Sequence, residues 1–336
     1  MEVESVERVV GRALLARAEW LDERHETGLR LFNGFIEGDP DLVIDLYARS
    51  LVIHNYASNP AVGQARADAA QAFLLSELPW VQAVVHKTRC ATDENARNGV
   101  LTFGEAPDRK VRENGVWYAL DLMLNADASL FLDTRLLRAW AKDHLAGKQV
   151  LNTFAYTGSL GVAARAGGAA RVVHVDINKR FLYLAKVSYT LNGIPIDKGD
   201  FVANDFWVHA ARLKNQDALF DCVIVDPPFF SVTDAGRVDL VSQAHRVINK
   251  VRPLVGHNGW LVTINNALFV SGQEYYAMLE SLCADGYLTI EELISVPEDF
   301  TGFPQTRVGQ FPTDPSPFNH STKIAILRVT RKDQRA

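Results

Sequence analysis

The chain is poor in cysteine and has no long apolar segment. Its three cysteines, Cys90, Cys222 and Cys283, lack CxxC spacing, which argues against a disulfide framework and a zinc site. No apolar run approaches the roughly 18 residues of a membrane-crossing helix. The start, MEVESVERVV, carries acids where a secretory signal carries bases. We therefore expect a cytoplasmic protein with no metal site and no membrane partner.

The sequence also lacks an excess of positive charge. Its formal net charge is -5 at pH 7, whereas a protein that coats nucleic acid neutralises many phosphates with Lys and Arg. This charge still allows a local basic face around an active-site mouth. With 336 residues, of which 48% are hydrophobic, the chain is long enough to form two domains with their own cores.

The first part of the chain has the pattern of a small α+β domain. Residues 4–24 place apolar side chains at helical spacing, and residues 29–56 alternate short β-rich runs with a GDPD turn, as antiparallel hairpins do. A helical segment, ADAAQAFLLSEL, and three further β-rich runs follow. We predict an α+β domain over residues 1–125 that binds the substrate.

From Arg135 onward, strand and helix patterns alternate. The runs KQVLNTFAY, ARVVHVDIN and FDCVIVD are β-rich, and amphipathic segments such as KRFLYLAKVSYTLNG separate them. This alternation predicts an α/β domain over residues 126–336, with a Rossmann-like, mostly parallel, doubly wound sheet. Ligands of such folds bind at the carboxyl ends of the strands.

Glycines and acids follow the first three strands of this domain. Gly158 and Gly161 lie in the turn after the first strand, and Asp176 ends the second. This spacing is typical of a nucleotide site, where the acid binds ribose hydroxyls, but a plain strand-to-helix turn explains the glycines equally well. Asp205 follows the third strand and is suited either to an adenine amino group or to capping the next helix.

The most specific motif is VIVDPPFF, at the end of the fourth strand. Paired prolines end a central strand abruptly. Asp226 and the Phe229 ring are then expected in the crevice where the strand order reverses. We predict that the catalytic site includes Asp226, Pro227, Pro228 and Phe229.

Together, SLFLDTR, VLNTFAYTG, HVDIN and DPPFF resemble the class I methyltransferases that modify bases of 23S ribosomal RNA, in particular the cytosine-C5 and guanine-N7 branches. The resemblance covers residues 113–327 and, more faintly, RLFNGFIEGDPDLVIDLY. No counterpart of the PUA domain of some relatives is visible. The resemblance implies S-adenosyl-L-methionine as cofactor and RNA rather than DNA as partner, namely 23S ribosomal RNA or a ribosomal precursor.

The resemblance also implies roles for single residues. Asp176 would hold the ribose, Asp205 the adenine, and Asp226 would lie beside the transferable methyl group. Phe154, Tyr156 and Gly158 would line the methionine end, and FLDTR would close over the cofactor, although Arg135 fits an ordinary helix charge equally well. The cofactor-binding residues implied in this way are Phe131, Asp133, Arg135, Asn152, Phe154, Tyr156, Gly158, Asp176, Ile177, Asn204, Asp205 and Asp226.

The residues after the fifth strand bear on the atom that is methylated. Cytosine C5 needs a covalent thiolate adduct, and the C5 branch carries its cysteine where this chain has Asn265 and Asn266. The Asn pair resembles the guanine-N7 branch, and Asn side chains suit a guanine edge, although a polar turn also explains them. We favour guanine N7, with Asn265 as a catalytic residue and no catalytic cysteine.

Other functions fit parts of the same pattern. DPPF also resembles motifs of exocyclic-amine methyltransferases, in which Phe229 would stack on the base. Cytosine C5 remains a weaker alternative. A small-metabolite methyltransferase fits the acidic charge and predicts a closed pocket, and an inactive RNA-binding protein would have lost cofactor binding.

We expect RNA to bind a basic surface of the first domain and the junction. Its members are Lys87, Arg89, Arg109, Lys110, Arg112, Arg135 and Arg138. Solvated strand-edge charges are the alternative explanation. In the tail, His320 and Lys323 are suited to a substrate-side role, but a solvated loop and strand edge is favoured.

Overall fold

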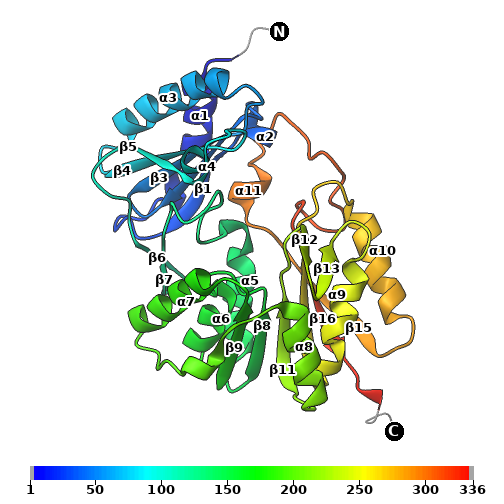
Figure 1. Cartoon of the computed structure of the whole chain (residues 1–336). Helices are drawn as coiled ribbons and strands as arrows, with labels where there is room; N and C mark the ends of the chain where they lie inside the picture. The colour runs from blue at the N-terminus through cyan, green and yellow to red at the C-terminus, as the bar shows by residue number, and fades with distance from the viewer. Residues whose placement is uncertain (1–3, 333–336) are drawn as a thin grey trace. The chain divides into compact units, whose positions relative to one another are not determined.

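The computed structural model describes residues 4–332, which form two compact units (Figure 1). The first contains the chain up to Leu132 together with Pro297–Phe311, and the second contains Asp133–Val296 and the chain from Pro312. The first unit extends past residue 125, the expected boundary, because its sheet holds the following segment. Tyr47 Oη donates to the Leu130 carbonyl at 2.8 Å.

The first unit is built on a five-stranded sheet in the order β1-β2-β3-β4-β5. Only β3 and β4 run parallel, and helix α3 makes the crossover between them. Helices α1 and α3 supply apolar side chains to one core with this sheet. A separate hairpin of β6 and β7 follows. The bounds are α1 Val6–Ala16, β1 Gly28–Asn33, α2 Gly34–Glu37, β2 Leu42–Tyr47, β3 Ser50–Asn55, α3 Pro60–Glu77, β4 Ala83–Thr88, α4 Glu94–Asn98, β5 Val100–Phe103, β6 Lys110–Glu113 and β7 Val116–Ala119.

The second unit confirms the predicted Rossmann-like α/β domain. Its sheet has the order β10-β9-β8-β11-β14-β16-β15, in which β16 is antiparallel to both neighbours and the five strands from β10 to β14 are parallel. The strands are β8 Gln149–Thr153, β9 Arg171–Asp176, β10 Phe201–Ala203, β11 Phe220–Val225, β14 Val255–Asn265, β15 Leu288–Ile294 and β16 Lys323–Val329. The strand order reverses between β8 and β11, where a ligand is expected.

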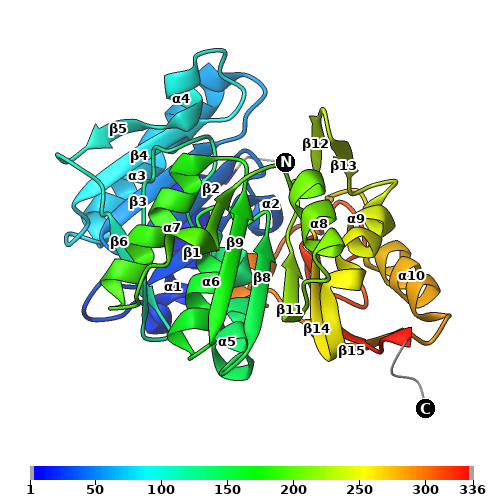
Figure 2. The same ribbon diagram turned by 60° about the horizontal axis from the view of Figure 1, so that its bottom comes forward.

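Helices form two layers over this sheet. Helices α5, α6 and α7 are neighbours in one layer, and α8, α9 and α10 are neighbours in the other (Figure 2). Their bounds are α5 Arg135–His144, α6 Ser159–Ala166, α7 Lys179–Leu191, α8 Phe206–Asn215, α9 Ala244–Val251 and α10 Gly272–Cys283. No helix within residues 4–332 is both long and apolar enough to cross a membrane.

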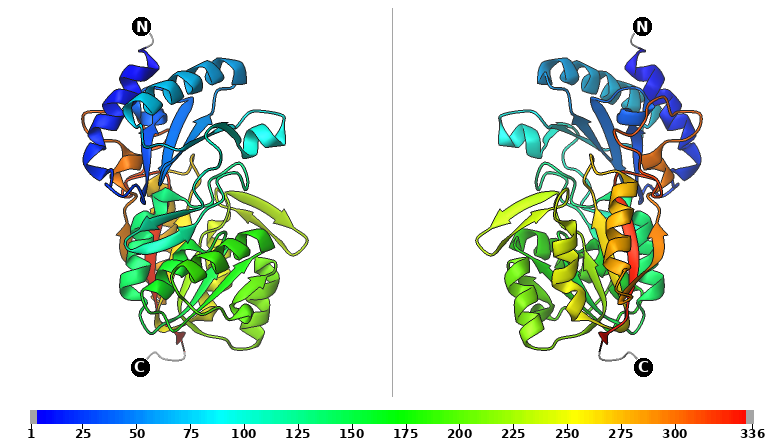
Figure 3. Two further views of the ribbon diagram at one scale, coloured as in Figure 1. Left: turned by 90° about the vertical axis from the view of Figure 1, so that its left-hand side faces the viewer. Right: turned by 90° about the vertical axis from the view of Figure 1, so that its right-hand side faces the viewer.

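A short hairpin projects from the second unit. Its strands are β12 Phe230–Thr233 and β13 Gly236–Asp239. The first strand begins at the last residue of the DPPFF motif. In Figure 3 it is the yellow-green ribbon that extends from the body of this unit. The sequence patterns did not predict this element.

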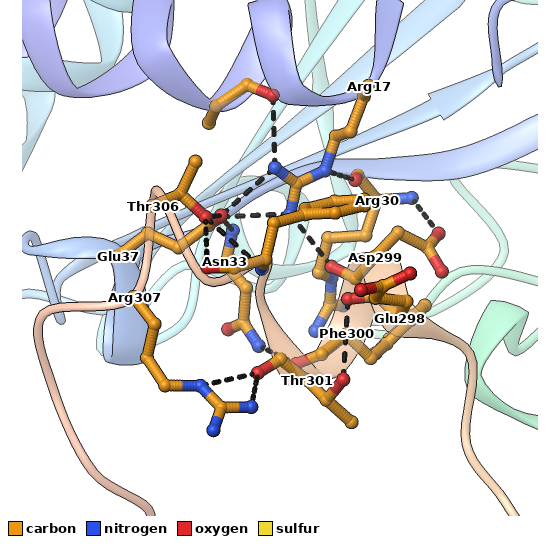
Figure 4. A network of polar contacts seen from close by, with 12 residues as sticks. Arg17, Arg30, Asn33, Glu37, Glu298, Asp299, Phe300, Thr301, Thr306 and Arg307 are labelled. Atoms are coloured by element: carbon orange, nitrogen blue, oxygen red, sulfur yellow. Dashed lines mark hydrogen bonds and ion pairs between the residues drawn. The ribbon is translucent and has the colours of Figure 1, made fainter. Parts of the chain in front are cut away.

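The segment Pro297–Phe311, with the short helix α11 Glu298–Thr301, joins the first unit through a buried polar network (Figure 4). The fully buried Arg17 donates to both carboxylate oxygens of Glu37 at 3.0 Å and to the Asp299 carbonyl at 2.9 Å. Asp299 Oδ2 in turn accepts from the Arg30 amide at 2.8 Å. Because a buried polar group left without its partner costs about 1–3 kcal/mol, these bonds through Asp299 hold the segment to the first unit.

Candidate functional site

The turn after β8 has an unusual backbone. Phe154, Tyr156 and Gly158 have φ values of 53°, 51° and 77°. The first two are non-glycine residues in the left-handed region, which costs of order 1–3 kcal/mol each and persists only where the surroundings hold it. Two bonds to the end of β9 do so: the Tyr156 amide donates to Asp176 Oδ2 at 2.8 Å, and the Ala155 amide to the Val175 carbonyl at 2.9 Å.

Asp176, the last residue of β9, accepts hydrogen bonds through both of its carboxylate oxygens. Its Oδ1 accepts from the Asn178 amide at 2.8 Å, so each carboxylate oxygen binds one backbone N–H. Burial raises the pKa of Asp176, against the two amides, which lower it. Each oxygen keeps a second lone pair, and the next side chain, Ile177, is 67% exposed. An acceptor beside an exposed apolar side chain suits a ribose and an adenine ring.

The two glycines are explained by packing. A Cβ atom on Gly158 would lie 2.6 Å from the Cβ of Ala185, and one on Gly161 would lie 2.4 Å from Cε1 of His174. Both glycines are therefore needed for the close approach of α6 to β9 and α7. Asn152 is also turned to this core, since its Nδ2 lies 3.4 Å from Nδ1 of His174. The cofactor argument rests on Asp176 rather than on the glycines.

Asp205 is the N-cap of α8. Its Oδ1 accepts from the amides of Trp207 at 2.7 Å and Val208 at 3.1 Å, and Asn204 Oδ1 accepts from the Asp205 amide at 2.8 Å. Both capping bonds use Oδ1. Asp205 is therefore able to cap α8 through Oδ1 and to accept from an adenine amino group through Oδ2 at the same time.

The DPPFF motif places a partly buried carboxyl group before an exposed ring. Burial, with a smaller contribution from the carboxylate of Asp133, raises the pKa of Asp226 to about 7. Pro227 is buried, Pro228 is exposed, and the Phe229 side chain is 48% exposed. A carboxyl group with this pKa is present in both protonation states near neutrality, so it both donates and accepts hydrogen bonds.

Asn265 does not present its amide to a ligand. The residue is buried, its Nδ2 donates to the Leu240 carbonyl at 3.2 Å, and its Oδ1 accepts from the Ala267 amide at 2.9 Å. These bonds hold the turn after β14 and the end of the β12–β13 hairpin. The following residue, Asn266, is exposed. Asn265 therefore does not make the expected contact with a base; it fixes this turn instead.

Lys323 is the first residue of β16 and pairs with Asn265 at the end of β14, and His320 lies three residues before it. Lys323 is fully buried, and its Nζ donates to the carbonyls of Ala267 at 3.0 Å and Ser321 at 2.6 Å, so the favoured solvated position is wrong for this residue. Burial lowers the pKa of Lys323 to about 8. His320 Nδ1 accepts from the Thr322 amide at 3.0 Å.

FLDTR crosses the boundary between the units. Phe131 belongs to the first unit, whereas Asp133 and Arg135 belong to the second. Asp133 Oδ2 accepts from Thr322 Oγ1 at 2.9 Å, which ties the turn before α5 to the residue before β16. Arg135 is partly exposed at the first position of α5.

The expected basic surface is smaller than the sequence indicated. Lys87 is fully buried and donates to the carbonyls of Asn125 at 2.7 Å and Asp127 at 2.8 Å. Arg138 is also buried and donates to Thr134 Oγ1 at 2.8 Å. Both were wrongly predicted to meet phosphates, because their cationic groups bind oxygens inside the protein. Arg89 is partly exposed and paired with Asp127 at 2.8 Å.

Hairpin β6–β7 keeps an exposed basic group. Arg109 and Lys110 are exposed, and Arg112 is partly exposed. The Lys110 Nζ lies 4.3 Å from the centre of the Trp117 ring. We define Arg109, Lys110 and Arg112 as the basic hairpin.

Two of the cysteines are unsuited to nucleophilic catalysis. Burial raises the pKa of the Cys222 thiol, and it also raises that of Cys283. A protonated thiol is a weak nucleophile. Across residues 4–332, no three His, Cys, Asp or Glu side chains are grouped so that they could hold a metal ion.

Comparisons with known proteins agree with this geometry. A family model described as S-adenosylmethionine-dependent methyltransferase matches residues 85–302. Ribosomal RNA large subunit methyltransferase I of Aeromonas hydrophila is 30% identical over 83% of this chain and 72% of its own length. The enzyme of that name from Photobacterium profundum is 28% identical over 82% and 68%.

A solved structure gives the same result for the fold. SMU.776, crystallised in complex with SAH, superposes with a TM-score of 0.83 at 23% identity, over 97% of this chain and 82% of its own. The resemblance drawn from DPPFF and its companion motifs is confirmed. The chain belongs to the S-adenosylmethionine-dependent methyltransferase family, and is thus an enzyme whose cofactor is S-adenosylmethionine.

Proposed function

We propose that this enzyme methylates a base of ribosomal RNA, with 23S ribosomal RNA of the large subunit as the substrate. The observation that carries the proposal is the half-exposed ring of Phe229, three residues after Asp226 in the loop that follows β11, where the strand order reverses. An exposed ring and a group that donates and accepts hydrogen bonds, both in one short loop, suit a flat base. The names of the Aeromonas and Photobacterium relatives support RNA as the source of that base. Ribosomal RNA as substrate also implies action in the cytoplasm.

The cofactor is assigned to the carboxyl ends of β8, β9 and β10. Asp176 binds the ribose hydroxyls, Ile177 packs on the adenine, and Oδ2 of Asp205 accepts from its amino group. The left-handed turn of Phe154, Tyr156 and Gly158 lines the methionine end, with Asn204 beside Asp205 and with Asp133 and Arg135 at the closing segment. Bound S-adenosylmethionine supplies an electrophilic methyl group. The residues around it align the base and exclude water, which accounts for much of the rate in such a displacement.

Guanine N7 is the atom we propose. N7 carries a lone pair and no proton, so its methylation needs alignment and no strong base. N7 methylation therefore does not depend on proton removal by Asp226, whose carboxyl group, with a pKa raised to about 7, would bind the base as donor or acceptor. We assign the edge of the base to Asn266, whose side chain is exposed, rather than to the buried Asn265.

An exocyclic amine is the second proposed atom, because the Asp226 carboxylate would accept its N–H. Cytosine C5 is disfavoured by the protonated state of Cys222 and Cys283.

Nucleoside mass spectrometry tests this proposal. We expect ribosomal RNA from a strain that lacks the gene to lose one 7-methylguanosine, and purified enzyme to restore it with S-adenosylmethionine. Loss of an N-methylated amine instead would select the second atom. Ribosomal RNA with an unchanged set of modified nucleosides would overturn the RNA substrate.

A further inference from the structure

Hairpin β12–β13 exposes an apolar face. On β12, Phe230 and Val232 point to the same side and are 50% and 65% exposed. The opposite side carries Ser231, whose cross-strand partner Val238 is buried in the core of the second unit. A sheet with one solvated face ordinarily turns polar residues outward. Here Val238 fixes which face is inward, and the apolar residues of β12 are outward.

A guanidinium group lies on the same face. Arg237 is the cross-strand partner of Val232, and its Cζ lies 4.9 Å from the centre of the Phe230 ring. Its Nη2 bonds to Asp239 Oδ2 at 2.7 Å, which fixes the side chain. Phe230 remains half exposed with the guanidinium beside it. A flat aromatic ring with an adjoining Arg is the combination on which unpaired bases stack.

The hairpin is held at its tip and at its base. A Cβ on Gly236 would lie 2.6 Å from Cδ1 of Trp207, so the tip packs directly on that ring. At the base, the Leu240 amide donates to the Phe229 carbonyl at 3.1 Å, and the Leu240 carbonyl accepts from Asn265. A surface fixed in this way loses little conformational entropy when a ligand binds.

The position of this face indicates its ligand. The hairpin begins at the residue after Phe229, so its outward face continues from the strand end that we assign to the methylated base. We propose that the outward face, formed by Phe230, Val232 and Arg237, binds an unpaired nucleotide next to the methylated base. The flanking base stacks on Phe230, and Arg237 meets its phosphate. This inference rests on the proposed function, because it takes RNA as the substrate.

The test compares two substitutions at Phe230 with a control. We measure, by fluorescence anisotropy, the affinity of the full-length protein for a labelled single-stranded 20-nucleotide RNA of 23S sequence and for its duplex. Removing a stacking ring weakens binding by about 5- to 150-fold per base, so we expect that loss for Phe230→Ala on the single strand only. Phe230→Trp restores the affinity. Leu219→Ala is the matched control, because Leu219 is 46% exposed directly before β11, at the amino end of that strand.

Three outcomes would overturn the inference. One is equal affinity of wild type and Phe230→Ala for the single strand. Another is wild-type binding to the duplex that is as tight as binding to the single strand. The third is a change of self-association in Phe230→Ala, measured by ultracentrifugation, with RNA affinity unchanged, which would assign the face to a second copy of the chain.

The proposed function is tested separately by methyl transfer from labelled S-adenosylmethionine to 23S ribosomal RNA. A wild-type protein that binds RNA through Phe230 and methylates none would support RNA binding by the outward face and would overturn the proposed function. Affinity for S-adenosylhomocysteine, measured by calorimetry, should be the same in all variants, which shows that the second unit is folded.

Discussion

The carboxylate of Asp133 raises the pKa of Asp226, although the two residues belong to different elements of the second unit. Asp133 precedes α5 and is held by Thr322 Oγ1 at 2.9 Å, whereas Asp226 follows β11. Burial supplies the larger part of the shift, which takes the Asp226 pKa from 3.8 to about 7. A raised carboxyl pKa at a strand end is typical of a functional group.

The first prediction concerns the pH dependence of methylation. We expect kcat/KM to show an inflection near pH 7 that belongs to Asp226. Asp133→Asn removes the neighbouring negative charge and keeps an oxygen for Thr322, so the inflection should move to lower pH. An inflection at the same pH in wild type and Asp133→Asn would contradict the coupling of the two groups.

The same shift predicts a change of stability with pH. The folded-state pKa of Asp226 lies above its value of 3.8 in the unfolded chain. Between pH 4 and pH 7 the folded state therefore binds more protons than the unfolded state, and this group lowers stability as pH rises. Asp226→Asn should remove that contribution. Denaturant unfolding of both proteins at pH 5 and pH 7.5 checks it, and an equal loss of stability in wild type and variant would assign the pH dependence elsewhere.

The second prediction concerns cofactor binding by Asp176. Asp176→Ala removes the proposed bonds to the ribose and also the acceptor that holds the Tyr156 amide. Since bonds to a charged group contribute about 1.5–3 kcal/mol, we expect affinity for S-adenosylhomocysteine to fall roughly 10- to 100-fold by calorimetry. Asp143→Ala, an exposed acid on α5, is the control. Unchanged affinity in Asp176→Ala would remove this residue from the cofactor site.

The third prediction is that no cysteine is catalytic. Because Cys222 is fully buried, it is replaced by Ala to avoid a buried hydroxyl, while Cys90 and Cys283 are replaced by Ser. The triple variant should methylate at near the wild-type rate. Gel electrophoresis of wild type with RNA that contains 5-fluorocytosine should show no covalent adduct, and a trapped adduct would restore cytosine C5 as the target.

The strand ends of the second unit could be predicted because the signals are local. Apolar β-rich runs predict β8, β9 and β11, and in a parallel sheet the residues after them meet at one edge. Asp176, Asp205 and Asp226 were located in this way. The direction of a side chain was less predictable, since Asn265 is turned inward by Leu240 and Ala267.

Long-range polar contacts explain what the sequence did not predict. The binding of Pro297–Phe311 to the first unit depends on Arg17, Glu37 and Asp299, which lie far apart in the chain. Lys87 and Lys323 were assigned to the surface because lysine is rarely buried. Each occupies an apolar strand and donates to two backbone carbonyls, and no local pattern indicates where those carbonyls lie.

The last prediction separates two lysines that the sequence grouped together. The triple variant Arg109→Ala, Lys110→Ala, Arg112→Ala neutralises the basic hairpin, whose first two residues are exposed. If these side chains bind phosphates, RNA affinity should fall in the variant. The salt dependence should flatten by about one unit of slope for each phosphate of duplex-like RNA that the variant no longer neutralises. Affinity for S-adenosylhomocysteine should not change, because these residues lie in the first unit.

Lys87→Met is the contrasting variant. It leaves the carbonyls of Asn125 and Asp127 without their ammonium donor, and each buried group left unsatisfied costs about 1–3 kcal/mol. We expect lower stability in denaturant unfolding and an unchanged salt slope for RNA binding. Full RNA affinity and an unchanged slope in the triple variant would remove the basic hairpin from the RNA surface and strengthen the small-metabolite alternative. A flattened slope in Lys87→Met at a temperature where the variant is folded would show instead that its ammonium group acts on RNA, against its burial.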